Sequence, residues 1–106
     1  MAKKLVGVCA CTMGLAHTFM AAQALEDAGK AAGYEVKIET QGADGVKNEL
    51  SAQDIDDADI IILAVAVTPQ GLDRFENYDY YEIGMQDAIK NADGIIREIE
   101  EDQAAA

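Results

Sequence analysis

The chain has 106 residues, half of them hydrophobic, and a formal net charge of −12 at pH 7. This length suits one hydrophobic core, so we expect residues 1–106 to form a single domain. The acidic balance argues against nucleic-acid binding, because phosphate backbones would be repelled. The longest apolar run, residues 60–67, is too short to span a bilayer. Residues 1–4 show no signal-peptide pattern, so we expect a cytoplasmic protein without direct membrane insertion.

The hydrophobic pattern predicts alternating strands and helices along the chain. The expected elements are a strand at 3–9, a helix at 16–33, a strand at 34–40, a short acidic helix from 51 to about 58, a strand at 60–65, a short turn or helix at 72–75, a strand at 80–83 and a C-terminal helix from Met85. The glycine-punctuated segment 41–45 is expected to be a loop, and residues 103–106 a frayed tail. This order predicts a three-layer α/β/α domain with a mainly parallel four-stranded sheet.

The C-terminal helix has the clearest period in the chain. Its apolar stripe is predicted to consist of Met85, Ala88, Ile89, Ala92, Ile95, Ile96 and Ile99. Gly94 lies within this helix at a cost of about 1 kcal/mol relative to alanine, which burial of the stripe should offset. Much of the acidic charge falls in residues 54–59 and 98–102, and we expect these segments to be solvated helix faces and ends.

A thiol follows the first predicted strand. Cys11 falls in the turn before the first helix, whereas Cys9 belongs to the strand and is expected to be a small buried apolar residue. A strand-to-helix turn offers unpaired backbone N–H groups and the positive end of a helix dipole. Such a setting favours a thiolate and binds tetrahedral oxyanions. The turn therefore predicts a nucleophilic Cys11 that takes up a phosphoryl group, with loops 41–45 and 68–71 converging on the same edge of the sheet.

The residues around this thiol also resemble a known motif. Residues 9–25 read CACTMGLAHTFMAAQAL, and they are similar to T-A-C-P-T-G-[IV]-A-H-T-[FY]-M-A-A-x-A-L, the pattern of the fructose-like enzyme IIB components of the bacterial sugar phosphotransferase system. Further matches are ETQG at 39–42, DI at 54–55, AD at 58–59 and RF at 74–75, so the resemblance covers essentially the whole chain. Thr12 stands where the family usually has proline, and Met13 where threonine is frequent.

The resemblance implies a phosphotransferase that carries a phosphoryl group on cysteine. Enzyme IIA, phosphorylated on histidine, would phosphorylate Cys11, and phospho-Cys11 would donate to a sugar held by the membrane enzyme IIC. No cofactor or metal is implied, and a carrier that meets two partners in turn is expected to be a monomer. The sugar itself is not identified by this chain, because the sugar binds to IIC.

The phosphoryl-binding loop implied by the motif consists of Thr12, Met13, Gly14, Leu15, Ala16, His17 and Thr18. Gly14 lets the backbone curl round the phosphoryl oxygens. His17, the only histidine, would stabilise the thiolate and the phosphate, or would be a helix residue bonded to the backbone. Thr18 would donate its hydroxyl to the phosphoryl group or cap the helix.

Two residues outside the loop are candidate partner contacts. Phe19 lies on the polar side of the first predicted helix, so with Met13 and Leu15 it would form an exposed apolar rim for docking IIA and then IIC. Alternatively, Phe19 folds over a neighbouring loop. Arg74, one of two arginines, would contact a partner or the phosphoryl group, or would be a plain surface residue.

Three other classes share parts of this pattern. A low-molecular-weight tyrosine phosphatase has the cysteine turn but requires an arginine where this chain has His17, and without it hydrolysis should be poor. A thiol redox or metal module could use the C-x-C-x₅-H set, which lacks a fourth ligand. A receiver-like or flavin-binding module would need other groups at the end of the first strand, and flavin would colour the protein yellow.

Overall fold

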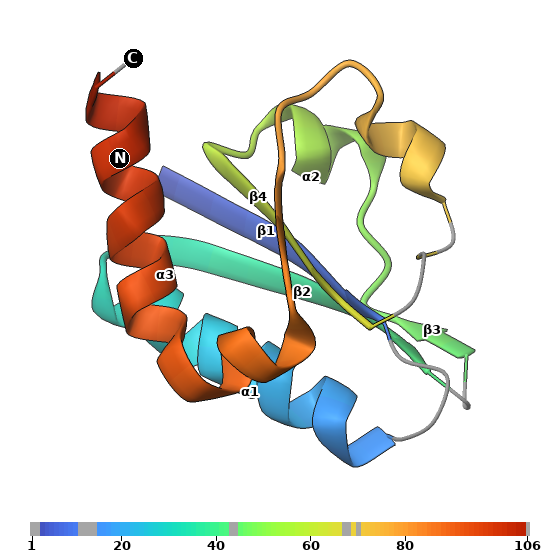
Figure 1. The fold of residues 1–106 in the computed structure, drawn as a ribbon. Coiled ribbons are helices and arrows are strands. Elements are labelled where there is room, and N and C mark those ends of the chain that lie inside the picture. The colour runs from blue at the N-terminus through green and yellow to red at the C-terminus, as the bar shows by residue number, and fades with distance from the viewer. Residues whose placement is uncertain (1–2, 11–14, 43–44, 67–68, 70, 106) are drawn as a thin grey trace.

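The computed structural model describes residues 3–10, 15–42, 45–66, 69 and 71–105, with the backbone alone for 15–17 and 105. Figure 1 shows how its elements are arranged. They are β1 (Lys3–Ala10), α1 (Leu15–Ala31), β2 (Tyr34–Gly42), β3 (Gly45–Lys47), α2 (Ala52–Asp56), β4 (Ile60–Val65), the 3-10 helix η1 (Leu72–Phe75), β5 (Tyr81–Ile83) and α3 (Met85–Ala105).

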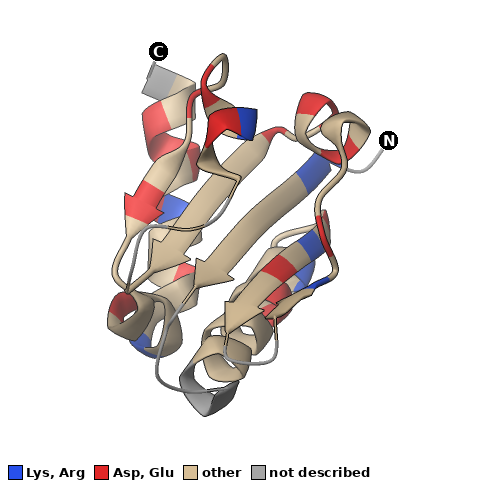
Figure 2. Cartoon of the chain, turned by 90° about the vertical axis from the view of Figure 1, so that its right-hand side faces the viewer, with Lys and Arg blue, Asp and Glu red and all other residues tan. Residues whose placement is uncertain are grey.

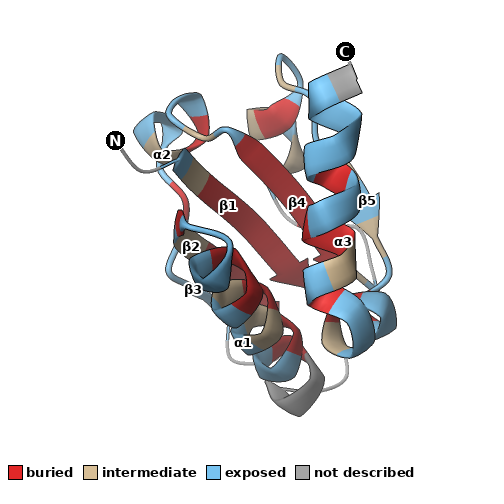
Figure 3. Cartoon of the chain, turned by 90° about the vertical axis from the view of Figure 1, so that its left-hand side faces the viewer, coloured by how far each residue is buried: buried red, intermediate tan, exposed pale blue. Residues whose placement is uncertain are grey.

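The strands form one sheet in the order β3-β2-β1-β4-β5. The pairs β2–β1, β1–β4 and β4–β5 are parallel, whereas β3 pairs with β2 in antiparallel orientation. α1 and α3 pack on one face and α2 and η1 on the other, which confirms the three-layer prediction. β1 and β4 are almost entirely buried between these layers (Figure 3), which explains why both strands are continuous apolar runs rather than alternating ones.

The sheet has five strands rather than the expected four. The loop prediction for residues 41–45 is wrong at both ends, because β2 continues to Gly42 and β3 begins at Gly45. The two strands form a hairpin in which Thr40 lies opposite Lys47. All three residues of β3 are exposed, so this strand has no buried face and leaves no hydrophobic alternation in the sequence.

α1 packs against the sheet through small and aliphatic residues. Ala21, Leu25 and Ala28 form its buried face. A Cβ atom at Gly29 would lie 2.6 Å from Cγ2 of Val36, so glycine is needed at this point of contact between α1 and β2. The absence of a side chain at Gly29 thus allows α1 to contact β2 closely at this point.

α3 buries the predicted apolar stripe, although Ile89 is only partly buried. Two details were not expected. The helix is kinked at Asn91, whose φ of −147° and ψ of 41° are not helical. The helix also continues to Ala105, into the tail expected to fray, and the Gln103 side-chain amide donates to the Asp59 carbonyl at 2.9 Å. The Tyr34 hydroxyl adds a 2.8 Å bond to Glu100, so the C-terminal half of α3 lies at the amino edge of the sheet.

Candidate functional site

The carboxyl edge of the sheet is the candidate site. β1 ends at Ala10 and α1 begins at Leu15, so Cys11, Thr12, Met13 and Gly14 connect the end of the central strand with the start of the helix. These four residues lie outside the described ranges, as do the side chains of Leu15, Ala16 and His17, and their roles stay predictions. The Ala66 amide donates to the Ala10 carbonyl at 2.9 Å, which places the end of β4 beside the end of β1.

Cys9 is the described cysteine of the motif, and it is unsuited to nucleophilic chemistry. Its side chain is fully buried in the core cluster beneath α1 and α3, which confirms its predicted apolar role. Burial raises the pKa of the Cys9 thiol to about 12, so the thiolate is not populated at neutral pH. The sequence has two cysteines, so the prediction of a nucleophilic thiol rests on Cys11 alone.

Thr18 lies inside the first turn of α1 and is 1% exposed. The helix begins three residues earlier, at Leu15, so the alternative in which Thr18 caps the helix is wrong. The other alternative, donation of the Thr18 hydroxyl to a phosphoryl group, stays a prediction.

Phe19 lies on the surface, as predicted, with 43% of the residue exposed. One side of its ring faces β3, where Nζ of Lys47 lies 5.4 Å from the ring centroid. The ring borders a groove of about 740 Å³ between α1 and the β2–β3 hairpin. Met20, which the sequence did not single out, is 52% exposed and adds apolar surface at the same end of α1. The start of α1 therefore presents apolar surface next to a cation.

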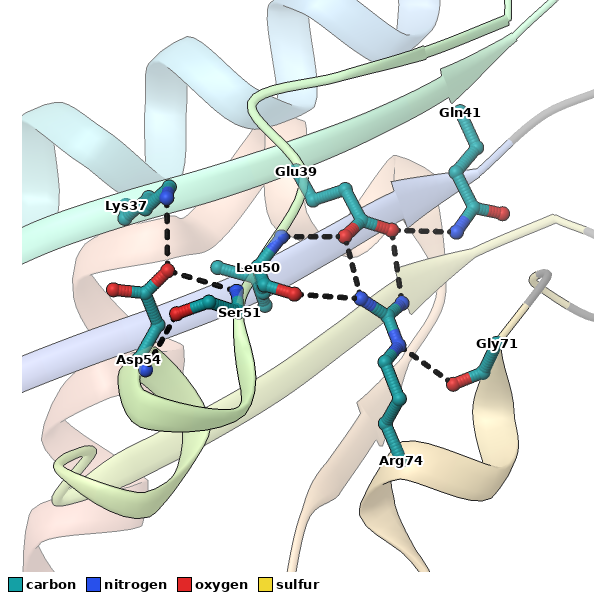
Figure 4. Close-up of polar contacts among 8 residues, drawn as sticks. All are labelled: Lys37, Glu39, Gln41, Leu50, Ser51, Asp54, Gly71 and Arg74. Atoms are coloured by element: carbon teal, nitrogen blue, oxygen red, sulfur yellow. Dashed lines mark hydrogen bonds and ion pairs between the residues drawn. The ribbon is translucent and has the colours of Figure 1, made fainter.

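Arg74 is not a plain surface arginine. Its Nη1 and Nη2 atoms lie 2.8 and 3.0 Å from the two carboxylate oxygens of Glu39 (Figure 4). Nε donates to the Gly71 carbonyl at 2.8 Å, and Nη1 also donates to the Leu50 carbonyl at 3.1 Å. The Leu50 amide and the Gln41 side-chain amide donate to Glu39 at 2.8 and 2.7 Å. The surface alternative for Arg74 is therefore wrong, whereas its contact with a partner stays a prediction.

This network keeps Glu39 charged inside the fold. Burial by itself would raise the pKa of the Glu39 carboxyl, but hydrogen bonds from Arg74, Leu50 and Gln41 outweigh it and hold that pKa below its usual range. The same carboxylate raises the pKa of Arg74. Sequence reasoning missed Glu39 as a functional candidate, because a single acidic residue between Ile38 and Thr40 does not reveal its partner 35 residues later.

Many of the acidic side chains lie away from the candidate site, although Glu39 and Asp87, in the first turn of α3, lie toward its edge of the sheet. Figure 2 shows the distant ones around α2 and the C-terminal half of α3, which lie at the amino edge of the sheet. The central strands are about 20 Å long, and the Debye length at physiological salt is about 8 Å. The field of these exposed acids is therefore largely screened at the carboxyl edge, which is compatible with anion binding there despite the net charge.

Other site types find little support in the part of the chain that the structure describes. Within those residues, no three or more histidine, cysteine or carboxylate side chains are grouped so that they could hold a metal ion. The C-x-C-x₅-H set falls partly outside them. None of the described helices has the length and apolar character needed to cross a bilayer.

Comparison with known proteins identifies relatives over nearly the full length. Residues 6–98 match the family model described as the PTS system lactose/cellobiose-specific IIB subunit. The chain is 71% identical to the PTS system fructose-like EIIB component 1 of Escherichia coli K12, over 95% of this chain and 94% of that protein. It is 46% identical to the fructose-like EIIB component 2 of the same organism, over 92% of each.

Two solved structures have the same architecture. The solution structure of an enzyme IIB subunit of the PTS system from E. coli K12 superposes with a TM-score of 0.94 at 70% identity, covering 99% of this chain and 97% of that one. A crystal structure of a domain from the fructose-specific IIABC component of Borrelia burgdorferi superposes with a TM-score of 0.87 at 40% identity, covering 92% and 93%.

Proposed function

Because the chain belongs to the fructose-like enzyme IIB components of the bacterial sugar phosphotransferase system, we propose that it is a cytoplasmic phosphocarrier with Cys11 as its acceptor. Enzyme IIA would be the phosphoryl donor, and a fructose-like sugar bound to the membrane enzyme IIC would be the final acceptor. The observation that carries this proposal is the position of Cys11, directly after the central strand and four residues before the start of α1.

The proposed chemistry is two successive phosphoryl transfers. In the first, the Cys11 thiolate attacks phosphorus, an S–P bond forms, the N–P bond to the donor histidine breaks, and the released imidazole nitrogen takes up a proton. In the second, a sugar hydroxyl attacks the same phosphorus, an O–P bond forms as the S–P bond breaks, the hydroxyl proton is released and the thiolate is regenerated. The start of α1 would supply N–H groups and a positive dipole end to the phosphoryl oxygens in both steps.

A direct test is intact-mass spectrometry after incubation with phosphoenolpyruvate, enzyme I, the histidine phosphocarrier and a fructose-type IIA. One phosphoryl adduct on the wild-type chain supports the carrier function. A chain that stays unmodified while IIA is phosphorylated, and that also stays unmodified after Thr12→Pro restores the family's usual residue, would overturn it.

His17→Gln is expected to slow phosphorylation of the chain by about 10-fold to 100-fold without changing its site. The imidazole would be protonated or would donate one hydrogen bond to the phosphoryl group, and glutamine keeps a donor but loses the cationic form. The first-order transfer rate from phosphorylated IIA should be measured between pH 6 and pH 8. Equal rates for the two proteins across this range would show that His17 is only a helix residue.

Phe19→Ala is expected to weaken docking of IIA while leaving the fold intact. The ring is exposed beside the groove between α1 and the hairpin, so its loss removes contact area rather than core packing. We expect the concentration of phosphorylated IIA at half-maximal rate to rise by about 5-fold to 30-fold, which corresponds to about 1–2 kcal/mol. Val46→Ala, which removes an exposed apolar side chain of β3, is the control and should leave this concentration unchanged. An unchanged half-saturating concentration for Phe19→Ala would remove the docking role.

A further inference from the structure

Glu39 and Arg74 form an ion pair at the carboxyl edge that the proposed chemistry does not use. Glu39 is 1% exposed, and the Arg74 side chain is 23% exposed. Glu39 lies opposite Val8 in the parallel register of β1 and β2, on the face covered by α2 and η1. A residue this deeply buried cannot touch a partner protein, so any effect of Glu39 on transfer must act through other groups.

Packing alone does not account for such a pair. Taking two charges out of water costs about as much as their attraction returns, and apolar residues of similar volume often stabilise a fold equally well. What apolar residues cannot supply is the set of directed hydrogen bonds seen here. Both oxygens of Glu39 are occupied, and the Arg74 guanidinium reaches two backbone carbonyls in addition to the carboxylate (Figure 4).

The network joins segments on both sides of β1. Glu39 and Gln41 belong to the end of β2, Leu50 precedes α2, and Gly71 and Arg74 belong to the segment that follows β4. In the sheet, β1 lies between β2 and β4. The network therefore fixes the chain that leaves one neighbour of β1 relative to the chain that leaves the other, at the edge where β1 leads to Cys11.

Gly71 shows that this contact is built into the backbone. Its φ of 72° is in the left-handed region, and a Cβ atom there would lie 2.7 Å from Nε of Arg74. Glycine thus allows the backbone turn that points the Gly71 carbonyl at Arg74 and leaves room for the guanidinium.

We propose that Glu39 and Arg74 are positioning residues for phosphoryl transfer, holding the segments after β2 and β4 in fixed relation across the end of β1. This inference rests on the carrier function proposed above. Neither residue touches the phosphoryl group in this role. Small displacements of the groups around a reacting atom lower the rate within the complex, and a misplacement of about 1 Å can cost about 100-fold.

The test compares Glu39→Gln, Arg74→Lys and their double variant with Lys37→Met. Lys37 lies on the same strand and pairs with Asp54 at 2.8 Å, so its loss removes an ion pair between β2 and α2 without touching the network. Single-turnover transfer from phosphorylated IIA is measured over a range of IIA concentrations, with urea unfolding of each variant alongside. We expect the maximal rate to fall by about 10-fold to 100-fold in both single variants, with the half-saturating concentration unchanged.

The double variant should be no slower than the slower single variant, because the two residues act as one unit. Lys37→Met should transfer at the wild-type rate. Three results would overturn the inference: wild-type rates in both single variants, a loss in Arg74→Lys alone, which would make Arg74 a direct contact, or an equal loss in Lys37→Met. Absence of any adduct on the wild-type chain and on Thr12→Pro, while IIA is phosphorylated, contradicts the carrier function itself and is distinguished from failure of this inference in the same experiment.

Discussion

Cys11→Ser is expected to abolish the phosphoryl adduct that the wild-type chain acquires from phosphorylated IIA. A serine hydroxyl is not ionised at neutral pH and is a weak nucleophile without an adjacent base, whereas a thiol at the start of a helix is readily ionised. Loss of the attacking group should lower the transfer rate by at least about 10⁴-fold. Intact-mass spectrometry of both proteins with the same upstream components measures this directly.

The matched control is Cys9→Ala, which removes the other thiol of the motif. Burial raises the pKa of Cys9 to about 12 and the side chain is inaccessible, so this variant should acquire the adduct as the wild type does. An adduct that persists in Cys11→Ser, or that disappears in a folded Cys9→Ala protein, would assign the acceptor to a different residue.

The parts of the fold that were predictable are those with a strong local pattern. The apolar run at 60–65 coincides with β4, because a strand covered on both faces needs no polar alternation. The 3.6-residue period of α3 identified its buried stripe, because one face of this helix packs on the sheet and the other is exposed. These signals depend only on which side of an element is buried.

The missed features depend on contacts between distant segments. β3 exists because it pairs with β2, and with all three residues exposed it has no pattern of its own. The kink at Asn91 is a local exception, and it was missed because it falls within an unbroken apolar period. The partner of Arg74 lies 35 residues away, and sequence spacing cannot distinguish a buried arginine with a carboxylate from an exposed one.

In the candidate site, too, the predictable residues are those whose placement follows from local sequence. The burial of Cys9 was predictable because this residue falls within the strand. The place of Cys11 between a strand and a helix also follows from the sequence order, whereas its role stays a prediction. The exposure of Phe19 followed from its place on the polar side of α1. The residues that hold the edge of the sheet together were not predictable, because their importance arises only when β2, β4 and η1 meet.

Arg74→Met is expected to destabilise the fold by about 3–5 kcal/mol, the cost of leaving one partner of a buried pair uncompensated. Methionine can fill part of the space, but it donates no hydrogen bond to Glu39 or to the Leu50 and Gly71 carbonyls. Lys37→Met removes a pair whose side chains are 42% and 28% exposed, so water screens the pair and its loss should destabilise the fold far less than Arg74→Met does. Urea unfolding at pH 7 measures the free energy of unfolding of both variants. Equal losses of stability would contradict the idea that an unpaired, buried Glu39 carboxylate is what destabilises Arg74→Met.

The pH dependence of the stability lost in Arg74→Met shows whether Arg74 stabilises the fold through its charge or through packing. In the wild type the folded pKa of Glu39 is lowered, so the pair stabilises the fold above the unfolded pKa of about 4.3, and this stabilisation is lost as pH falls through the folded pKa. Without Arg74, only the Leu50 and Gln41 hydrogen bonds still oppose the effect of burial, so the pKa of Glu39 rises from its wild-type position. The penalty is then present at neutral pH and decreases as the carboxyl takes up a proton. The deficit of Arg74→Met should therefore be smaller at pH 5 than at pH 7, and adding Glu39→Leu should recover most of it at pH 7. A deficit that is the same at both pH values, and that the second substitution does not reduce, would mean that Arg74 stabilises the fold through packing rather than through its charge.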